Sequence, residues 1–539
     1  MKIKQIIVLL SFGTFLCAVS LTVVHAEDFG KQLLRELFKE PEKKQNADPA
    51  NTQQQNTPQQ SAATSQQKEI IYSGYSKAFM PVKTMFACGR AGDAVAMCDP
   101  KALKAAYAAA NKSTTSKAEQ VKGTALNSEV LANLEGGNIA LCSGNVDQAI
   151  DKFSGAENVF EKSESTTKVG GWFKKTTIFA METMLGNEEL GDYNGEGYER
   201  VLMLNLKSIA YLLAGQREAY NVTRRSINWQ ENEKKRFAEK IQSAKKELAS
   251  KERGQGSSKS SGLGLTQSLA KDYTPMETKA TTVPSAYVNP FGYYVAGMVQ
   301  EFESFNDPSL RDNAYISYKK ALEFNPGSKV LREIVDDVKK TPPPGKRLVH
   351  IVAGDGFVPE KKLLKTGIKT EKSVVPVKLP IYVPVPSQVS RIEVADMKGK
   401  KLATLSTVAD VEAICLRNQM DGAVLRECKL FMAIMRSSVE QGVSDGLGDF
   451  GKTFSAVRDQ MTTPDMRSWM SLPATMQAAR FYIPASADKI KIVTYDAQGN
   501  KLASNTVTLD TSSHNFVSVR SIDKTLYVQA NKKMWFAKN

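Results

Sequence analysis

The stretch of the sequence with the clearest chemical potential is GLGDFGKT, residues 446–453, which has the spacing of a phosphate-binding P-loop. In such a loop the backbone N–H groups of a tight glycine-rich turn bind phosphates. Lys452 would reach the terminal phosphates and Thr453 would hold magnesium. The motif needs a buried strand that runs into its first glycine and a helix that follows the loop.

The residues around GLGDFGKT do not supply that context. The preceding RSSVEQGVSD is polar, lies in a segment predicted to be helical, and contains no buried strand. The strand that ends at Asp496 could offer an acid for magnesium, but YDAQGN is typical of the approach to a hairpin. We therefore interpret the glycines as a flexible connection between helices, and the sequence does not predict an NTPase.

Other catalytic and metal-binding patterns are also incomplete. Ser317 and Lys320 form an S-x-x-K, and residues 365–367 form a K-T-G, which are two of the three motifs of penicillin-interacting serine enzymes. No S-D-N lies between them, and Ser317 falls within a predicted repeat helix. No C-x-x-C exists, and His350 and His514 are each isolated, so we expect them to be structural or exposed. We predict no catalytic residue, metal ligand or cofactor.

The N-terminus has the pattern of a secretory signal peptide. Lys2 and Lys4 precede an apolar run over residues 6–24, and the small residue Ala26 follows. We predict a signal peptide at residues 1–26 that is cleaved after Ala26. The run is nearly long enough to span a bilayer, so a membrane anchor is the alternative. Lipidation of Cys17 is disfavoured because the bulky Leu16 precedes it.

The chain carries a net positive charge, which indicates the classes of partner that it could bind. Cleavage would remove Lys2 and Lys4 and no acid, so the formal charge of +15 would become 15 − 2 = +13. A charge of this size favours polyanions such as nucleic acid, lipid headgroups or cell-wall polymers. Most basic residues lie beside acids, as in residues 231–253, which is typical of a solvated helical face. No interleaving of aromatic and basic residues indicates nucleic-acid binding.

Five cysteines would remain after cleavage of the signal. They are Cys88, Cys98, Cys142, Cys415 and Cys428. Short separations suggest Cys88–Cys98 and Cys415–Cys428 as local disulfides, which would leave Cys142 unpaired in a helix. Spacing alone does not determine the pairing.

Changes in composition divide the chain into segments. Residues 27–40, EDFGKQLLRELFKE, place Phe29, Leu33, Leu37 and Phe38 on one helical stripe that could dock on a partner, on a membrane or on the protein itself. With the Gln-rich tether that follows, residues 27–68 form one segment. We predict a helical domain at 69–340, with a flexible interruption at 253–268, and a β-domain at 345–539 after the boundary TPPPGKR.

The helical domain contains a repeated pattern of small and aromatic residues that is typical of tetratricopeptide repeats. The clearest copy is AYISYKKALEFNP, and two looser copies begin near residues 133 and 201. The predicted repeat-packing residues are Gly137, Ala149, Phe153, Ala156, Tyr211, Gly215, Gly297, Ala314, Tyr318, Ala321 and Pro326. Small residues let paired helices approach closely, and each pair needs a neighbour to bury its remaining face. We expect a short solenoid that binds polypeptides, although plain helical hairpins would show the same spacing.

The sequence after Pro344 has the alternation of short strands. Strands are expected in RLVHIVAGDGFVP, VKLPIYVPVPSQVSRIEVAD and GKKLATLS, and again from ARFYIP to KTLYVQA, with a hairpin at QGN. We predict a β-sandwich interrupted by a helical insert at about residues 408–475. The expected fold class is therefore α+β, with a TPR-like α-solenoid followed by a β-sandwich.

Three stretches resemble the signature regions of a bacterial family of exported tetratricopeptide-containing proteins, often lipoproteins, whose function is uncharacterised. They are YNGEGYERVLMLNLKSIAYLLAGQREAYNVTRRSIN, YVNPFGYYVAGMVQE and DMRSWMSLPATMQAARFYIP. The first signature carries Tyr193, Gly195, Glu196, Gly197 and Glu199, and the last carries Asp465, Arg467, Ser468, Trp469, Leu472 and Pro473. The resemblance covers about residues 125–500. It brings no catalytic residue, and the weak lipobox at Cys17 puts lipid anchoring in doubt.

Together these observations predict an exported, non-catalytic scaffold of the cell envelope, in the periplasm or at the outer membrane of a Gram-negative-type envelope. Its expected partners are envelope proteins held by the repeats; peripheral membrane contact is possible. The alternative is a glycan- or cell-wall-binding protein that acts through the β-sandwich, with exposed aromatic residues such as Trp469 or Trp535. The candidate site residues are Tyr193, Glu196, Tyr198, Glu199, Arg200, Arg467 and Trp469. They would either form one shared site or cap helices and bridge the two domains.

Overall fold

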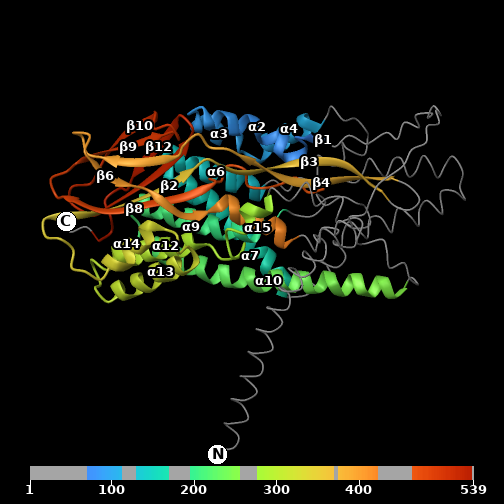
Figure 1. Cartoon of the computed structure of the whole chain (residues 1–539), viewed down its shortest axis with the longest axis horizontal. Helices are drawn as coiled ribbons and strands as arrows, with labels where there is room; N and C mark the ends of the chain where they lie inside the picture. Colours follow the sequence, from blue (N-terminus) through green and yellow to red (C-terminus); the bar gives the residue numbers. More distant parts are fainter. Residues whose placement is uncertain are drawn as a thin grey trace, which may run out of the picture. The chain divides into compact units, whose positions relative to one another are not determined.

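Helices make up most of the first part of the chain and strands most of the second, so the fold is mixed α and β. The computed structural model describes residues 69–111, 129–168, 193, 195–254, 276–369, 374–422 and 464–536. The helices are α2 (Gly74–Ala87), α3 (Ala91–Met97), α4 (Pro100–Asn111), α6 (Glu129–Ser143), α7 (Val146–Lys168), α9 (Gly197–Leu213), α10 (Glu218–Gly254), α12 (Pro290–Glu303), α13 (Leu310–Phe324), α14 (Lys329–Asp337) and α15 (Val411–Asp421). Figure 1 shows their arrangement.

The strands form three sheets within the described residues. They are β1 (Glu69–Ile71), β2 (Lys346–Asp355), β3 (Phe357–Lys369), β4 (Val374–Val385), β5 (Arg391–Ala395), β6 (Lys401–Thr404), β7 (Ser406–Asp410), β8 (Thr475–Pro484), β9 (Lys489–Tyr495), β10 (Lys501–Thr508), β11 (Asn515–Ile522) and β12 (Thr525–Ala530). The sheet orders are β1-β3-β4, β10-β9-β5-β6 and β12-β11-β2-β8-β7. Only the β11–β2 pair is parallel in these ladders. The expected QGN hairpin joins β9 to β10, with Gly499 at φ 85°.

Consecutive helices pack in pairs, α6 on α7, α9 on α10, and α12 on α13. The glycines at the contacts have a steric reason. A Cβ on Gly137 would lie 2.8 Å from the ring of Phe153, and one on Gly297 would lie 2.8 Å from the ring of Tyr318. Only glycine lets these helices approach so closely.

The first helix of each pair faces the sheets, and the second lies farther from them. Helices α6 and α9 contact β11, and α12 contacts β7, whereas the main contacts of α7, α10 and α13 are with other helices. The buried Ala149 and Ala156 of α7 and the buried Ala314 and Ala321 of α13 fill the contacts between helices.

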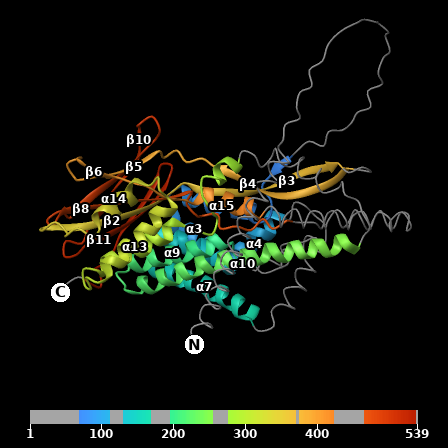
Figure 2. The same cartoon turned by 60° about the horizontal axis from the view of Figure 1, so that its bottom comes forward.

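The five-stranded sheet lies between the helices and the four-stranded sheet. Successive side chains of β2 point to opposite faces of this sheet and so enter two different cores. Leu348 and Val352 belong to the core shared with the helices. Val349 and Ile351 point to the opposite face and share a second core with β5 and β9. Strand β2 is therefore buried on both faces, and its sequence is a nearly continuous apolar run. Figure 2 shows the helices on one side of this sheet.

The predicted helical and β-domains share one core instead of packing as separate bodies. All of the described residues belong to a single compact unit. The C-terminal segment after β12 adds a further link, because the Lys532 N–H donates to the Leu213 carbonyl at 2.8 Å. Gly215, expected as a repeat-packing residue, instead has φ +72°, and a Cβ there would meet the Lys533 carbonyl oxygen at 2.1 Å.

Several sequence predictions fall on residues outside the described ranges. These are the signal peptide, the segment 27–68, the GLGDFGKT motif, Cys428 and most of the insert 408–475. The described ends of the insert are β7 and α15 before it and residues 464–474 after it, which have no regular secondary structure. Within the described residues, none of the helices combines the length and apolar character that crossing a bilayer requires.

The expected Cys88–Cys98 disulfide is not formed. Cys88 and Cys98 are both free thiols, and so is Cys415. Cys88 is exposed at the end of α2, whereas Cys98 is buried at the end of α3 against the core. The two sulfurs thus face different environments despite their short separation in sequence.

Candidate functional site

The signature stretches GYER (197–200) and RSW (467–469) lie side by side in the structure. The segment 464–474, which we call the strap, runs past the N-terminal turn of α9. The backbone N–H of Trp469 donates to Glu199 Oε1 at 2.8 Å. The next two N–H groups, of Met470 and Ser471, donate to Glu135 of α6 at 2.6 and 2.9 Å. Two glutamates from two helices thus bind three consecutive amides of the strap.

Glu199 also caps its own helix. Helix α9 begins with a capping box in which Glu196 is the N-cap residue and Glu199 is the third helical residue. Glu199 Oε2 accepts from the Glu196 N–H at 2.9 Å and from the Tyr193 hydroxyl at 2.5 Å. One oxygen of this carboxylate therefore caps α9 and the other joins α9 to the strap, as the capping-and-bridging hypothesis expects, whereas a shared interaction site stays a prediction.

Both strap-binding glutamates are fully buried, and no ion pair joins either of them to a Lys, Arg or His within the described ranges. Burial raises the pKa of Glu135 from 4.5 to about 8, and hydrogen bonds from the strap only partly oppose this effect. Burial and the nearby Glu196 charge raise the pKa of Glu199 in the same direction. The amides of the strap act as the main stabilising donors for these carboxylates.

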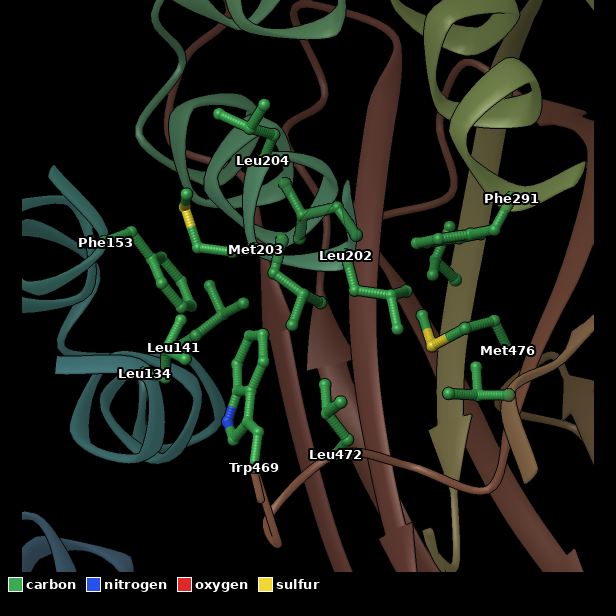
Figure 3. Packing of buried hydrophobic residues seen from close by; sticks show 14 of the residues in the cluster. Leu134, Leu141, Phe153, Leu202, Met203, Leu204, Phe291, Trp469, Leu472 and Met476 are labelled. Carbon is green, nitrogen blue, oxygen red and sulfur yellow. The ribbon is translucent and has the colours of Figure 1, made fainter. Parts of the chain in front are cut away.

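Trp469 is a core residue and is not exposed on the β-domain, so this expectation of the glycan-binding alternative is wrong. Its side chain is 0 % exposed. Its indole packs edge-on against Phe153 of α7, with ring centroids 6.2 Å apart, and its Nε1 donates to Ser471 Oγ at 3.1 Å. Figure 3 shows Trp469 beside Leu134 and Leu141. The indole is fully enclosed because the strap runs between helices and strands.

Arg467 anchors the other end of the strap. It is 2 % exposed and pairs with Asp465 at 2.9 Å, while its guanidinium lies 5.4 Å from the ring centroid of Tyr193. Burial alone raises the pKa of Asp465, but the charge of Arg467 outweighs it and holds that pKa below its ordinary value. The Arg467 carbonyl accepts from Lys361 Nζ of β3 at 2.8 Å.

Tyr198 and Arg200, the remaining candidates, lie near this site but bind other partners. The Tyr198 hydroxyl donates to Cys415 Sγ of α15 at 3.4 Å. Arg200 pairs with Glu233 of α10 at 3.1 Å. The structure therefore brings Tyr193, Glu199, Arg467 and Trp469 together in one network and leaves these two residues at its border.

A second buried charge cluster, which sequence reasoning missed, joins α12 to the five-stranded sheet. Glu301 accepts from Arg480 at 2.6 Å, from Tyr318 at 2.9 Å and from His350 at 3.0 Å. Burial by itself would raise the pKa of Glu301, but Arg480 and His350 have the larger, opposite effect and bring this pKa down to about 2. Burial lowers the pKa of His350, more than Glu301 raises it. The sequence did carry one signal for this cluster, because an arginine such as Arg480 within the apolar strand ARFYIP needs a buried acid as its partner.

Two further residues that the sequence analysis considered, Ser317 and His514, have structural partners. Ser317 of the S-x-x-K donates to Gln300 at 2.7 Å within the helix pair. His514 accepts from the Leu348 N–H through Nδ1 at 2.9 Å, and burial lowers its pKa to about 4. Across the described ranges, no group of three or more His, Cys, Asp or Glu residues is placed to hold a metal ion. The arrangement can therefore lock helices and strands together, and its buried acids can take up protons.

Comparison of the chain with protein-family models, with curated proteins and with solved structures gave no match.

Proposed function

We propose that this protein is a non-catalytic scaffold of the cell envelope that binds other proteins through TPR-like repeats. The observation that carries the proposal is the packing of successive helix pairs. In two of the three pairs a glycine of the first helix faces an aromatic ring of the second, Gly137 against Phe153 and Gly297 against Tyr318. This contact is typical of tetratricopeptide repeats, whose usual role is to bind polypeptides.

The position of the strap favours the outer face of the repeats as the proposed partner surface. Glu135, Glu199 and Glu301 of the first helices already bind the strap or strand β8. A partner on this inner side would have to displace buried hydrogen bonds and the enclosed Trp469. We therefore place the partner surface on the outer side, along α7, the first half of α10, and α13.

The proposal also gives a role to the four- and five-stranded sheets. We propose that the four- and five-stranded sheets form a β-sandwich, because the apolar faces of β2, β5 and β9 share one core. The sandwich would hold the repeats in a fixed orientation. Its position in the envelope rests on the signal-peptide pattern of residues 1–26.

A crosslinking experiment in intact cells tests this proposal. The variant Arg224→Glu/Lys319→Glu reverses two exposed charges on the outer sides of α10 and α13, and Lys398→Glu/Lys400→Glu reverses two exposed charges at the β5–β6 turn as a matched control. We expect the same crosslinked proteins for wild type and control, and their loss from the outer-face variant. An unchanged set in both variants, or recovery of glycan alone, would move the function to the β-part.

A further inference from the structure

The four-stranded sheet has one face in a core and one face that is exposed. Ile392 and Val394 of β5, and Ile490 and Ile492 of β9, enter the core that this sheet shares with β2. Successive side chains of a strand point to opposite faces, so the residues between these four point away from β2. Figure 2 shows β5, β6 and β10 on the far side of β2 from α9 and α13.

The exposed face of this sheet is basic, and we call it the outer sheet face. The strand registers place five cations and one acid on it: Arg391, Lys401, Lys489, Lys491, Lys501 and Glu393. Its net formal charge is therefore 5 − 1 = +4. Four of the cations are exposed, and Lys491 is partly exposed. The charges thus form one positive surface that spans all four strands.

The single acid of the outer sheet face pairs with two of the five cations. Glu393 lies 3.0 Å from Arg391 and 3.5 Å from Lys401. No ion pair within the described ranges includes any of the other three cations. Lys489 and Lys491 are two residues apart in β9, which separates their Cα atoms by about 7 Å. Their charges repel each other at this range, so an external anion would stabilise the arrangement.

Hydroxyl groups accompany the lysines of the outer sheet face. Ser504, Thr506 and Thr508 of β10 point to this face and are exposed. Thr506 lies directly opposite Lys491, and Thr508 lies directly opposite Lys489. Each pair therefore presents an ammonium donor beside a hydroxyl that can both donate and accept a hydrogen bond.

A tyrosine lies between two of the cations. In the strand registers Tyr495 of β9 is opposite Lys501 on one side and Arg391 on the other. The guanidinium of Arg391 lies 4.7 Å from the centroid of the tyrosine ring. Tyr495 is partly exposed and belongs to neither of the two core clusters. Its ring thus offers a flat, amphipathic contact surface within the basic face.

The composition of the outer sheet face favours a hydrated polymer over other polyanions. Binding of a protein or of a bilayer usually relies on large apolar side chains. The large apolar residues that are exposed in the described ranges lie elsewhere, as Met397 does in the β5–β6 turn. A single-stranded nucleic acid stacks its successive bases on several aromatic rings, whereas Tyr495 is the one aromatic residue in the four strands of this sheet.

From these observations we infer that the outer sheet face binds an acidic polysaccharide. The acidic groups of the polymer contact the lysines, and its sugar hydroxyls exchange hydrogen bonds with Ser504, Thr506 and Thr508. One sugar ring lies against Tyr495. This inference is independent of the proposed protein binding, because that surface lies on α7, α10 and α13.

Isothermal titration calorimetry tests the inference with the chain of residues 27–539. The three probes are carboxymethyl dextran, which is an acidic polysaccharide, uncharged dextran, and polyglutamate, which carries carboxylates without sugars. We expect binding to carboxymethyl dextran that weakens at high salt, and no binding to dextran. Binding to polyglutamate should be about tenfold weaker, because this polymer lacks the sugar hydroxyls.

Two variants that lose the same charge locate the site. Lys491→Gln/Lys501→Gln removes two cations from the outer sheet face, and Lys101→Gln/Lys104→Gln removes two exposed lysines from α4 as a matched control. The first variant should bind carboxymethyl dextran about tenfold more weakly, since an exposed ion pair contributes up to about fivefold. The control should lose less than about twofold, because its lysines lie on another element and are screened by salt.

A third variant tests the contribution of the hydroxyls. Ser504→Ala/Thr506→Val keeps every charge and should weaken binding about tenfold, since a neutral hydrogen bond contributes roughly two- to tenfold. All variants should keep the circular dichroism spectrum of the wild type, because the replaced side chains are on the surface. No binding of the wild type to carboxymethyl dextran would overturn the inference. Equal binding to polyglutamate, equal losses in the two lysine variants, or full binding by the hydroxyl variant would overturn it too.

Discussion

Replacement of Glu199 by alanine should destabilise the helices and the sheets together. Glu199 accepts three hydrogen bonds, from the Trp469 amide, the Tyr193 hydroxyl and the Glu196 amide. The donors of Trp469 and Tyr193 are buried, and an orphaned buried donor costs about 1–3 kcal/mol. Removal of a buried carboxylate recovers part of its desolvation cost, so we expect a net loss of about 2–4 kcal/mol.

The assay is guanidinium unfolding of the chain of residues 27–539, followed by two probes. Far-UV circular dichroism reports mainly the helices, and hydrogen exchange of peptides from β2 and β8 reports the sheets. In Glu199→Ala both probes should shift to lower denaturant by the same amount, because helices and sheets share one core. Glu196→Gln is the matched control, since Glu196 is only partly buried and should lose less than about 1 kcal/mol.

A shift in one probe alone would refute this reasoning, because it would mean that the two halves unfold independently. An unchanged midpoint in both probes would also refute it, since the strap would then not depend on the Glu199 carboxylate.

Three further predictions concern single residues. Gly297→Ala should cost about 1–3 kcal/mol in thermal unfolding because its Cβ would lie 2.8 Å from a tyrosine ring, whereas Gly92→Ala meets no atom within 4 Å and should be neutral or slightly stabilising. Burial raises the pKa of Glu135 to about 8, so its contribution to the free energy of unfolding is complete below pH 4.5 and is lost as the pH rises through 8. Burial also acts to raise the pKa of Glu301, but the paired Arg480 lowers it to about 2. The contribution of Glu301 to the free energy of unfolding is therefore present above pH 4.5 and is lost as the pH falls through 2. Unfolding midpoints against pH should therefore lose their alkaline decline in Glu135→Gln and their acid decline in Glu301→Gln, and wild-type curves in both would contradict this. Cys88 should react with a maleimide far faster than the buried thiols, and equal rates for all thiols would contradict the described burial.

Local patterns predicted the parts of the fold that depend on local spacing. The clear repeat AYISYKKALEFNP forms α13, and its Tyr318 ring lies against Gly297 as the small-aromatic spacing requires. The three prolines after residue 341 precede the change from helices to strands. These features depend on steric rules within a few residues, so a single sequence is enough to indicate them.

The strap and its acids could not be predicted because they depend on contacts across most of the chain. Met470 and Glu135 are 335 positions apart, and no periodicity marks either of them. The glycan-binding alternative expected an exposed Trp469, because no pattern in an irregular segment indicates which side chains are enclosed. Glu135 sits in an apolar helical stretch, LEGGN, where a buried acid could have been suspected but its partner could not.

The buried strap limits where the partner that we propose could bind. A repeat that presents an empty inner face can exchange ligands at little cost, but here that face holds three amides and an enclosed indole. Displacement of these groups would orphan two buried glutamates and expose the core, which costs as much as a large part of the stability of a domain. Binding of the partner that we propose would leave the fold intact only if it used the outer helices α7 and α13 and the first half of α10.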